Sequence, residues 1–262
     1  MPNARLMYNM TVEEVREGLL DTRTVLLPVG VVEQHGYHLP LSTDIHNAQE
    51  IAHRASAETG CFVAPCIHYS FSGGMLPGTI NINPQLFSLV LVDICRSLYV
   101  QGFRNIVILL GHGGTENVRA SEDAAIMFQR LSPELEGVTV AVVPFWQLSA
   151  TYGGAFEEGD FHSGRYETSL MLYWKPELVQ MDAAQLDDPA LVARMRQDPD
   201  AYLLQDKRVD SPFVAPKQTQ DPAMRVGVMG DYTGASAEFG RQICEEAVAG
   251  LVRFIQQLDA EE

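Results

Sequence analysis

A run of apolar residues in the middle of the chain limits the possible folds more than any other feature. Residues 105–111 read "NIVILLG", with five consecutive aliphatic residues between Asn105 and Gly111. Such a short apolar run between turn residues is typical of a strand buried on both faces. Further strand-like runs are "TVLLPVGV" from Thr24, "CFVAP" from Cys61 and "VTVAVVPFW" from Val138. Because helical segments separate these runs, we expect an α/β fold with a mostly parallel sheet and helices on both faces.

The helical segments carry recognisable ends and apolar faces. Residues 84–102 begin with Pro84, which suits a first helical turn, and end at Gly102, which can terminate a helix. Further helices are expected over residues 45–58 and 115–131, and from Ala235 to the end of the chain. Residues 179–225 show weaker periodicity and are expected to form a helical excursion or a partner-facing arm. With no repeat and no second domain visible, residues 1–262 are predicted to form one domain.

Composition and charge exclude several classes of partner. The net charge of −16 arises from 34 acidic against 18 basic residues, so binding to nucleic acid or to anionic membranes is not expected. The amino terminus lacks the pattern of a signal peptide, and the apolar stretch around residues 88–100 is interrupted by Asp93 and Arg96. The four cysteines show no CxxC spacing and are expected to be reduced thiols. These features predict a cytoplasmic protein.

Metal-seeking side chains follow two of the predicted strands. Glu33 and His35 come after the first strand, His112 follows "NIVILLG", and Asp44 stands at the expected start of a helix. Since ligands bind at the carboxyl ends of strands in open α/β sheets, these four side chains are expected to meet at one edge. Carboxylate and imidazole together suit zinc or manganese, and a carboxylate can bridge two ions. The sequence therefore predicts a divalent metal centre.

Other polar residues near these segments are open to more than one interpretation. His38 and His46 can be donors behind the metal ligands or ordinary loop residues. The glycine-rich "GHGG" around His112 can bend around a metal ligand or cradle a phosphate, although it lacks the spacing of a nucleotide-binding loop. Glu116 can reach the same site or cap the following helix.

A third segment, "GDFHSGRYETSLML" from Gly159, adds a histidine and a carboxylate. His162 precedes a turn of small residues and can move protons near neutral pH. Glu167 opens an apolar helix, where it either joins the site or interacts with the helix dipole.

Taken together, these segments resemble the creatininase family over nearly the whole chain. The stretch Glu33–Asp44 resembles the family signature E-x-H-G-x-H-L-P-x-x-T-D, and "LPGT", "GHGG", "PFW", "HSGRYETSLML" and "GDYTGASAEFG" recur in the family order. The resemblance implies a three-layer α/β/α sandwich, two divalent ions (Zn²⁺ or Mn²⁺) and a homo-oligomer, often a hexamer. It also implies that Asp44 bridges the ions and that His162 is catalytic. The metal ligands implied by position are Glu33, His35, Asp44 and His112, with either Glu116 or Glu167 as the fifth.

One departure from the family pattern bears on the substrate. Creatininases proper carry a glutamate directly before the catalytic histidine, where this chain has Phe161. Creatinine is therefore expected to be a poor substrate, and a non-creatinine member, such as a ring-opening hydrolase of oxidised inositol, is the favoured interpretation. His38, Trp146 and Phe161 are the expected substrate contacts.

The resemblance leads to a specific chemical hypothesis. A metal-bound hydroxide attacks a carbonyl of a small, cyclic substrate, and His162 transfers the proton, with Asp160 or Glu116 as a possible base. The bond broken is C–N in a cyclic amide or formamide, or C–C in a cyclic diketone. The alternatives are creatinine amidohydrolase itself, a nucleotide-dependent enzyme using "GHGG", and a non-catalytic protein with a structural metal. The last is disfavoured because structural sites commonly use cysteine, which the candidate segments lack.

Overall fold

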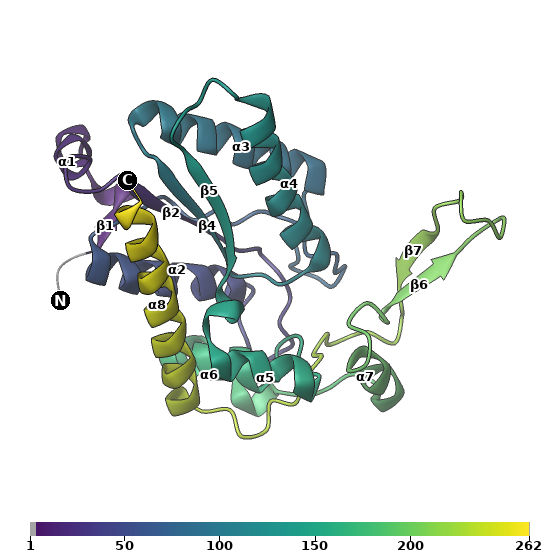
Figure 1. Cartoon of the computed structure of the whole chain (residues 1–262). Coiled ribbons are helices and arrows are strands. Elements are labelled where there is room, and N and C mark those ends of the chain that lie inside the picture. Colours follow the sequence, from purple (N-terminus) through teal and green to yellow (C-terminus); the bar gives the residue numbers. More distant parts are fainter. Residues whose placement is uncertain (1–3, 262) are drawn as a thin grey trace.

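A parallel sheet forms the centre of the molecule (Figure 1). The structure is a computed structural model that describes residues 4–261. Within these residues, five strands lie side by side in the order β1-β3-β2-β4-β5, and every neighbouring pair is parallel. Their bounds are β1 (Arg5–Leu6), β2 (Thr24–Val29), β3 (Phe62–Val63), β4 (Asn105–Leu110) and β5 (Thr139–Pro144). The strands predicted at residues 24, 61, 105 and 138 are thus present as β2, β3, β4 and β5.

Helices cover both faces of this sheet, because its strands are apolar on both sides. In β4, Val107 and Leu109 pack into one apolar cluster, whereas Ile106, Ile108 and Leu110 pack into another on the opposite face. The first cluster includes residues of α2, α5, α6 and α8, and the second includes residues of α3 and α4. The three-layer α/β/α fold is confirmed. The helices are α1 (Val12–Gly18), α2 (Thr43–Thr59), α3 (Pro84–Gln101), α4 (Thr115–Leu131), α5 (Ala150–Glu158), α6 (Arg165–Trp174), α7 (Pro189–Met195) and α8 (Ala237–Ala260).

Local sequence explains where the longest helices begin and end. Helix α3 starts at Pro84, with the side chain of Asn83 accepting the backbone N–H of Gln85, and it ends at Gly102 in the left-handed conformation. Helix α8 buries Ile243, Ala247, Leu251 and Ile255 along one face. Both helices have the ends or the apolar face predicted from the sequence.

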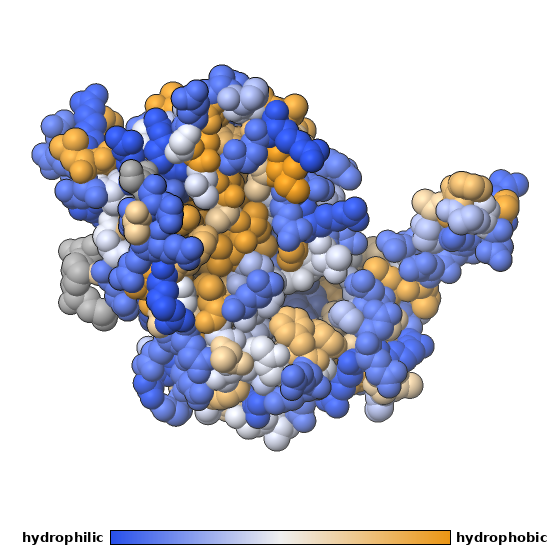
Figure 2. All heavy atoms as spheres, viewed as in Figure 1, coloured by the Kyte–Doolittle hydropathy of each residue, from blue (hydrophilic) through white to orange (hydrophobic). Residues whose placement is uncertain are grey.

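Strand β5 differs from its neighbours because it lies at the edge of the sheet. Its residues are exposed or half-buried, whereas all six residues of β4 are buried. Figure 2 shows apolar surface gathered over this part of the molecule.

The four cysteines are free thiols, as expected, with Cys66 half-buried and the others buried. Among residues 4–261, no helix is both long and apolar enough to span a lipid bilayer.

The chain between α6 and α8 leaves the sheet and forms a separate excursion. It contains α7 and an antiparallel hairpin of β6 (Leu203–Asp206) and β7 (Lys217–Gln220), which projects from the body (Figure 1). A small apolar cluster holds the base of this excursion, and Phe161 packs against it. The excursion thus contains both a helix, α7, and a projecting hairpin, and the expectation that such an arm faces a partner stays a prediction.

Candidate metal centre and active site

The carboxyl ends of β2 and β4 meet the first turn of α2, and this junction builds the site. Gly111 follows β4 so closely against α2 that a Cβ atom there would lie 2.1 Å from the backbone oxygen of Asp44. A Cβ at Gly30, after β2, would lie 2.6 Å from Ile45 Cα. Only glycine permits this approach, which places the loops after both strands beside the Asp44 side chain. The glycine of "GHGG" that precedes His112 thus has a packing role, with no phosphate needed to explain it.

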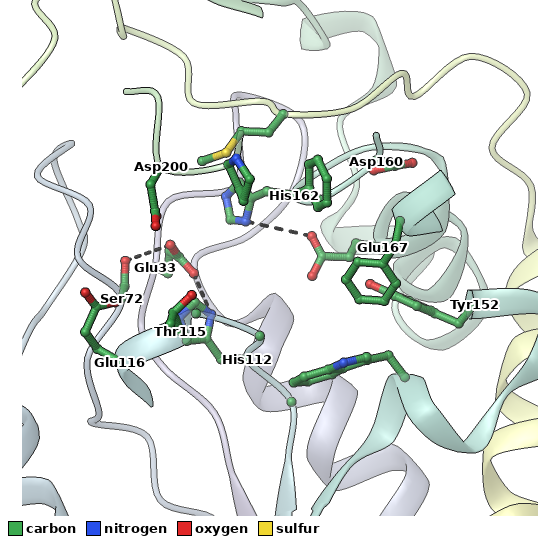
Figure 3. A pocket seen from close by; sticks show the side chains of 18 of the residues that line it. Glu33, Ser72, His112, Thr115, Glu116, Tyr152, Asp160, His162, Glu167 and Asp200 are labelled. Atoms are coloured by element: carbon green, nitrogen blue, oxygen red, sulfur yellow. Dashed lines mark hydrogen bonds and ion pairs between the residues drawn. The ribbon is translucent and has the colours of Figure 1, made fainter. Parts of the chain in front are cut away.

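Three groups of side chains have ligand atoms close enough together to hold a metal ion, and one of them joins Glu33, His35 and His162. The other two share Asp44, and we call them the two triads; Glu33, Asp44 and His112 form the first. His112 Nδ1 lies 3.0 Å from Glu33 Oε2 and 3.1 Å from Asp44 Oδ2. All three residues are buried, and their ligand atoms lie close enough together to hold one metal ion. The Ser72 hydroxyl donates to Glu33 Oε1 at 2.7 Å, which leaves Oε2 facing the triad (Figure 3).

His35, Asp44 and Glu167 form the second triad. His35 Nε2 lies 3.4 Å from Asp44 Oδ1 and 3.6 Å from Glu167 Oε2. His35 Nδ1 lies 3.1 Å from the backbone oxygen of Glu33, which can only accept a hydrogen bond. Nδ1 therefore carries the proton and the lone pair of Nε2 faces the carboxylates, an orientation typical of metal-binding histidines.

Asp44 belongs to both triads and turns a different oxygen to each. Oδ2 lies nearest His112 and Oδ1 nearest His35. Glu33 Oε2, Asp44 Oδ2 and His35 Nε2 are buried, and none has a partner with hydrogen-bond geometry among the described residues, although His112 Nδ1 lies close to both oxygens. Since buried polar atoms without partners are costly, this convergence fits a pair of cations that share the Asp44 carboxylate.

The electrostatics of the triads match this fit. Burial favours neutral His112, but the carboxylates of Glu33 and Asp44 outweigh it and raise the pKa of His112 to about 10. Burial alone would raise the pKa of Glu33, yet the neighbouring His112 and His162 lower it well below its ordinary value. The carboxylates are thus held ionised by positive charge, which a divalent ion supplies more strongly than a histidine.

Helix α6 carries Glu167, and the turn before it aims that carboxylate. Ser163 adopts the left-handed conformation, with φ of 57°, which is uncommon for a residue other than glycine. Its backbone N–H donates to Glu167 Oε2 at 2.7 Å. His162, just before this turn, has its Nδ1 4.0 Å from the same oxygen (Figure 3).

A cavity of about 330 Å³ opens beside the two triads. Glu33, His112, His162 and Glu167 reach its wall, and an aromatic group lines another part of it: Trp146, Tyr152, Phe156 and Phe161. Asp160 also lines the cavity, and burial, followed by the charge of Glu167, raises the pKa of Asp160 to about 7. Pro199, Asp200 and Tyr202 close the cavity from the excursion between α6 and α8.

The structure separates the remaining candidates from the triads. Glu116 lines the cavity but is exposed on the first turn of α4 and belongs to neither triad, so Glu167 lies where a fifth ligand would be needed. His38 does not line the cavity, contrary to the expectation of a substrate contact. It is buried behind α6, where its Nε2 lies 3.0 Å from Thr168 Oγ1. His46 is half-buried on α2, outside both triads.

Several residues of the site had no signal in the sequence. Ser72 and Tyr202 lie in segments without a chemical motif, and Gln34 stands between two expected ligands but is not itself a residue type that favours metal.

The chain is similar to known proteins in sequence and in fold. The profile of the family described as "Creatininase: Creatinine amidohydrolase" matches residues 8–255. A "Mycofactocin precursor peptide peptidase" from Mycolicibacterium smegmatis is 32% identical over 234 residues, which cover 86% of this chain and 81% of the relative. A "3-dehydro-scyllo-inosose hydrolase" from Thermotoga maritima is 26% identical over 98% of this chain and 83% of its own length. The solved structure described as "Creatininase Mn" superposes with a TM-score of 0.77 at 24% identity and covers 98% of this chain and 99% of that one.

Proposed function

Because this chain belongs to the creatininase family, we propose that it is a divalent-metal-dependent hydrolase that attacks a carbonyl in a small substrate. We propose C–N cleavage in place of the ring opening of an oxidised inositol expected from the sequence, because relatives at 30–32% identity are peptidases, whereas the inosose hydrolase is 26% identical. The observation that carries the proposal is the pair of buried triads sharing Asp44. The relatives named above are hydrolases or a peptidase of the same family. The donor set of three carboxylates and two histidines suits Zn²⁺ or Mn²⁺.

Each residue of the site has a defined part in this chemistry. Two divalent ions, held by Glu33, Asp44 and His112 on one side and His35, Asp44 and Glu167 on the other, would lower the pKa of water and polarise a carbonyl. His162 Nδ1 faces the second triad and can carry a proton to the leaving nitrogen. Trp146 and Phe161 offer apolar contact to the rest of the substrate. Asp160 is buried beside them and is the alternative general base.

The cavity supports a small substrate. Its volume of about 330 Å³ lies at the lower end of ordinary ligand pockets. It can hold a cyclic amide, a formamide or the end of a short peptide. The last of these is included because a peptide peptidase is among the relatives. The homo-oligomer implied by the family resemblance remains a prediction, which light scattering of the purified protein tests.

Metal analysis combined with a substrate panel tests the proposal. We expect protein purified without chelators to contain up to two Zn²⁺ or Mn²⁺ per chain, and we expect chelation to abolish turnover. The panel contains creatinine, neutral lactams, N-formyl amines, short peptides and cyclic diketones. The diketones are included because an inosose hydrolase is a relative. Full activity in EDTA would overturn the metal mechanism, and exclusive turnover of diketones would replace C–N by C–C cleavage.

A further inference from the structure

Asp187 lies outside the cavity, yet it makes an unusual set of hydrogen bonds. Its carboxylate accepts the backbone N–H groups of three consecutive residues, Arg225, Val226 and Gly227, at 2.6, 2.7 and 2.5 Å. Asp187 is only 8% exposed. Charge-assisted bonds of this kind are roughly twice as strong as neutral ones. Asp187 therefore fixes the start of the segment formed by residues 225–230, which we call the 225–230 loop.

The 225–230 loop binds the side chain of Gln34. Gln34 Nε2 donates to the backbone oxygen of Gly227 at 3.2 Å, and Gln34 Oε1 accepts the N–H of Gly36 at 3.2 Å. These two opposite partners determine which end of the amide points each way. Gly227 has φ of 83°, and a Cβ there would lie 2.3 Å from the Gln34 amide, so the contact requires glycine.

The same loop also binds the backbone around His162. The N–H of Phe161 donates to the oxygen of Met229 at 3.0 Å, and the N–H of Met229 donates to the oxygen of His162 at 2.9 Å. One segment, held by Asp187, thus fixes both the main chain of His162 and the residue that contacts its ring.

The ring of His162 meets Gln34 at a single nitrogen. His162 Nε2 lies 2.8 Å from the backbone oxygen of Gln34 and 3.2 Å from Gln34 Nε2. The shorter contact is to a carbonyl, which can only accept, so the proton lies on Nε2 and the hydrogen bond is to the backbone oxygen of Gln34. The side-chain nitrogen of Gln34 is also a donor and makes no hydrogen bond to the ring; the Gln34 side chain instead links the 225–230 loop to the backbone that carries this oxygen. The lone pair of Nδ1 is then directed toward the second triad, where Glu167 Oε2 is 4.0 Å away.

We propose that Asp187 and Gln34 are positioning residues, which act through the 225–230 loop and the backbone oxygen of Gln34 to hold the ring of His162 with Nδ1 facing the metal ligands. The inference rests on the proposed function, in which His162 carries the proton. Neither residue contacts the reacting atoms, so their loss is expected to slow the chemical step and to leave substrate binding and metal content nearly unchanged.

The first experiment compares Asp187→Asn with Asp188→Asn in the full-length, zinc-loaded protein. Asp188 is the matched control, because its carboxylate also accepts two backbone N–H groups, at the start of α7, without touching the 225–230 loop. Using the best substrate of the panel, we expect Asp187→Asn to lower kcat by about 10- to 100-fold, the range for residues that orient a catalytic group from behind. KM and zinc content should stay the same, and Asp188→Asn should retain kcat. An unchanged kcat in Asp187→Asn, or equal losses in both variants, overturns the inference.

A double-mutant cycle with Gln34→Leu tests whether the two residues act along one path. If they do, the loss of kcat in the double variant is about equal to the loss in the more impaired single variant, because the effects of coupled residues are not additive. Multiplied losses overturn the inference.

Crystal structures of the zinc-loaded variants separate this inference from the proposed function. We expect the contact between His162 Nε2 and the Gln34 carbonyl to be lost in Asp187→Asn and kept in Asp188→Asn. If the contact is preserved in Asp187→Asn, the inference is overturned, whatever the activity of the unchanged protein. If the unchanged protein hydrolyses no compound of the panel, that result counts against the proposed function and not against the inference.

Discussion

The two triads differ in how their outer carboxylates are held. Glu33, in the first triad, is oriented by a side chain, the hydroxyl of Ser72. Glu167, in the second, is oriented by the backbone N–H of Ser163, whose left-handed conformation is part of the turn before α6. A side-chain contact can be removed by one substitution, whereas a backbone contact survives most substitutions. The first triad should therefore be the easier of the two to weaken separately.

The largest loss of metal and of turnover is expected for Asp44, which both triads share. Asp44→Ala removes the carboxylate that both share, so two cations would lie close together without their common anion. We expect lower metal content and no measurable turnover, while circular dichroism shows a retained fold. Asp93→Ala, an exposed position on α3, is the control. Equal metal content in Asp44→Ala and the unchanged protein would contradict the shared carboxylate.

The second prediction separates the triads by their outer carboxylates. Glu167→Gln replaces a charged ligand by a neutral one, so the protein should bind one ion fewer per chain and lose most of its turnover. Glu116→Gln alters a carboxylate that lines the cavity outside both triads, and it should retain both ions. Elemental analysis decides between them. The reverse result would make Glu116 the fifth ligand.

The third prediction concerns the cavity wall beside the second triad. Phe161 packs against the apolar cluster of the excursion and offers no proton donor or acceptor. Because general acid–base help is typically worth about 10²–10⁴-fold in rate, creatinine should be a poor substrate with either Mn²⁺ or Zn²⁺. A kcat/KM for creatinine of about 10⁴ M⁻¹s⁻¹ or more, typical of an efficient enzyme, would show that Phe161 does not exclude it.

The smallest effect tests the comparison directly. Ser72→Ala removes the hydroxyl that orients Glu33, so the affinity for one of the two ions should fall by about 10- to 100-fold, as for other residues behind a ligand. Ser163→Ala keeps the N–H that orients Glu167 and should leave both affinities unchanged. Titration of chelated protein with Zn²⁺ measures both. If the two variants behave alike, the difference between the triads is not real.

The parallel sheet and the convergence of candidate ligands after β2 and β4 could be predicted because they follow from local patterns. A continuous apolar run indicates a buried strand, and the carboxyl ends of parallel strands meet at one edge. The choice between Glu116 and Glu167 could not be made from the sequence because it depends on where the first turns of α4 and α6 direct these side chains. The left-handed turn at Ser163, which orients Glu167, has no signature in "HSGRYE". The side chain of His38 turns behind α6 instead of into the cavity, which spacing alone does not reveal.

The contacts that orient the residues of the site could not be predicted from sequence patterns, for another reason. Asp187 meets Gly227 across 40 positions, and Ser72 meets Glu33 across 39. A single aspartate or serine in a polar segment is compatible with many partners. Only the folded backbone selects one.

The excursion between α6 and α8 gives this protein two parts that can change at different rates. The ligands come from the sheet edge and from α2 and α6, where close packing leaves little freedom. The far wall of the cavity comes from Pro199, Asp200 and Tyr202, on a segment held by its own small cluster. Insertions or replacements around these three residues, away from Asp187 and the 225–230 loop, can reshape the wall without disturbing a ligand or His162. One reaction centre can thus be passed on through evolution while the molecules admitted to it are exchanged.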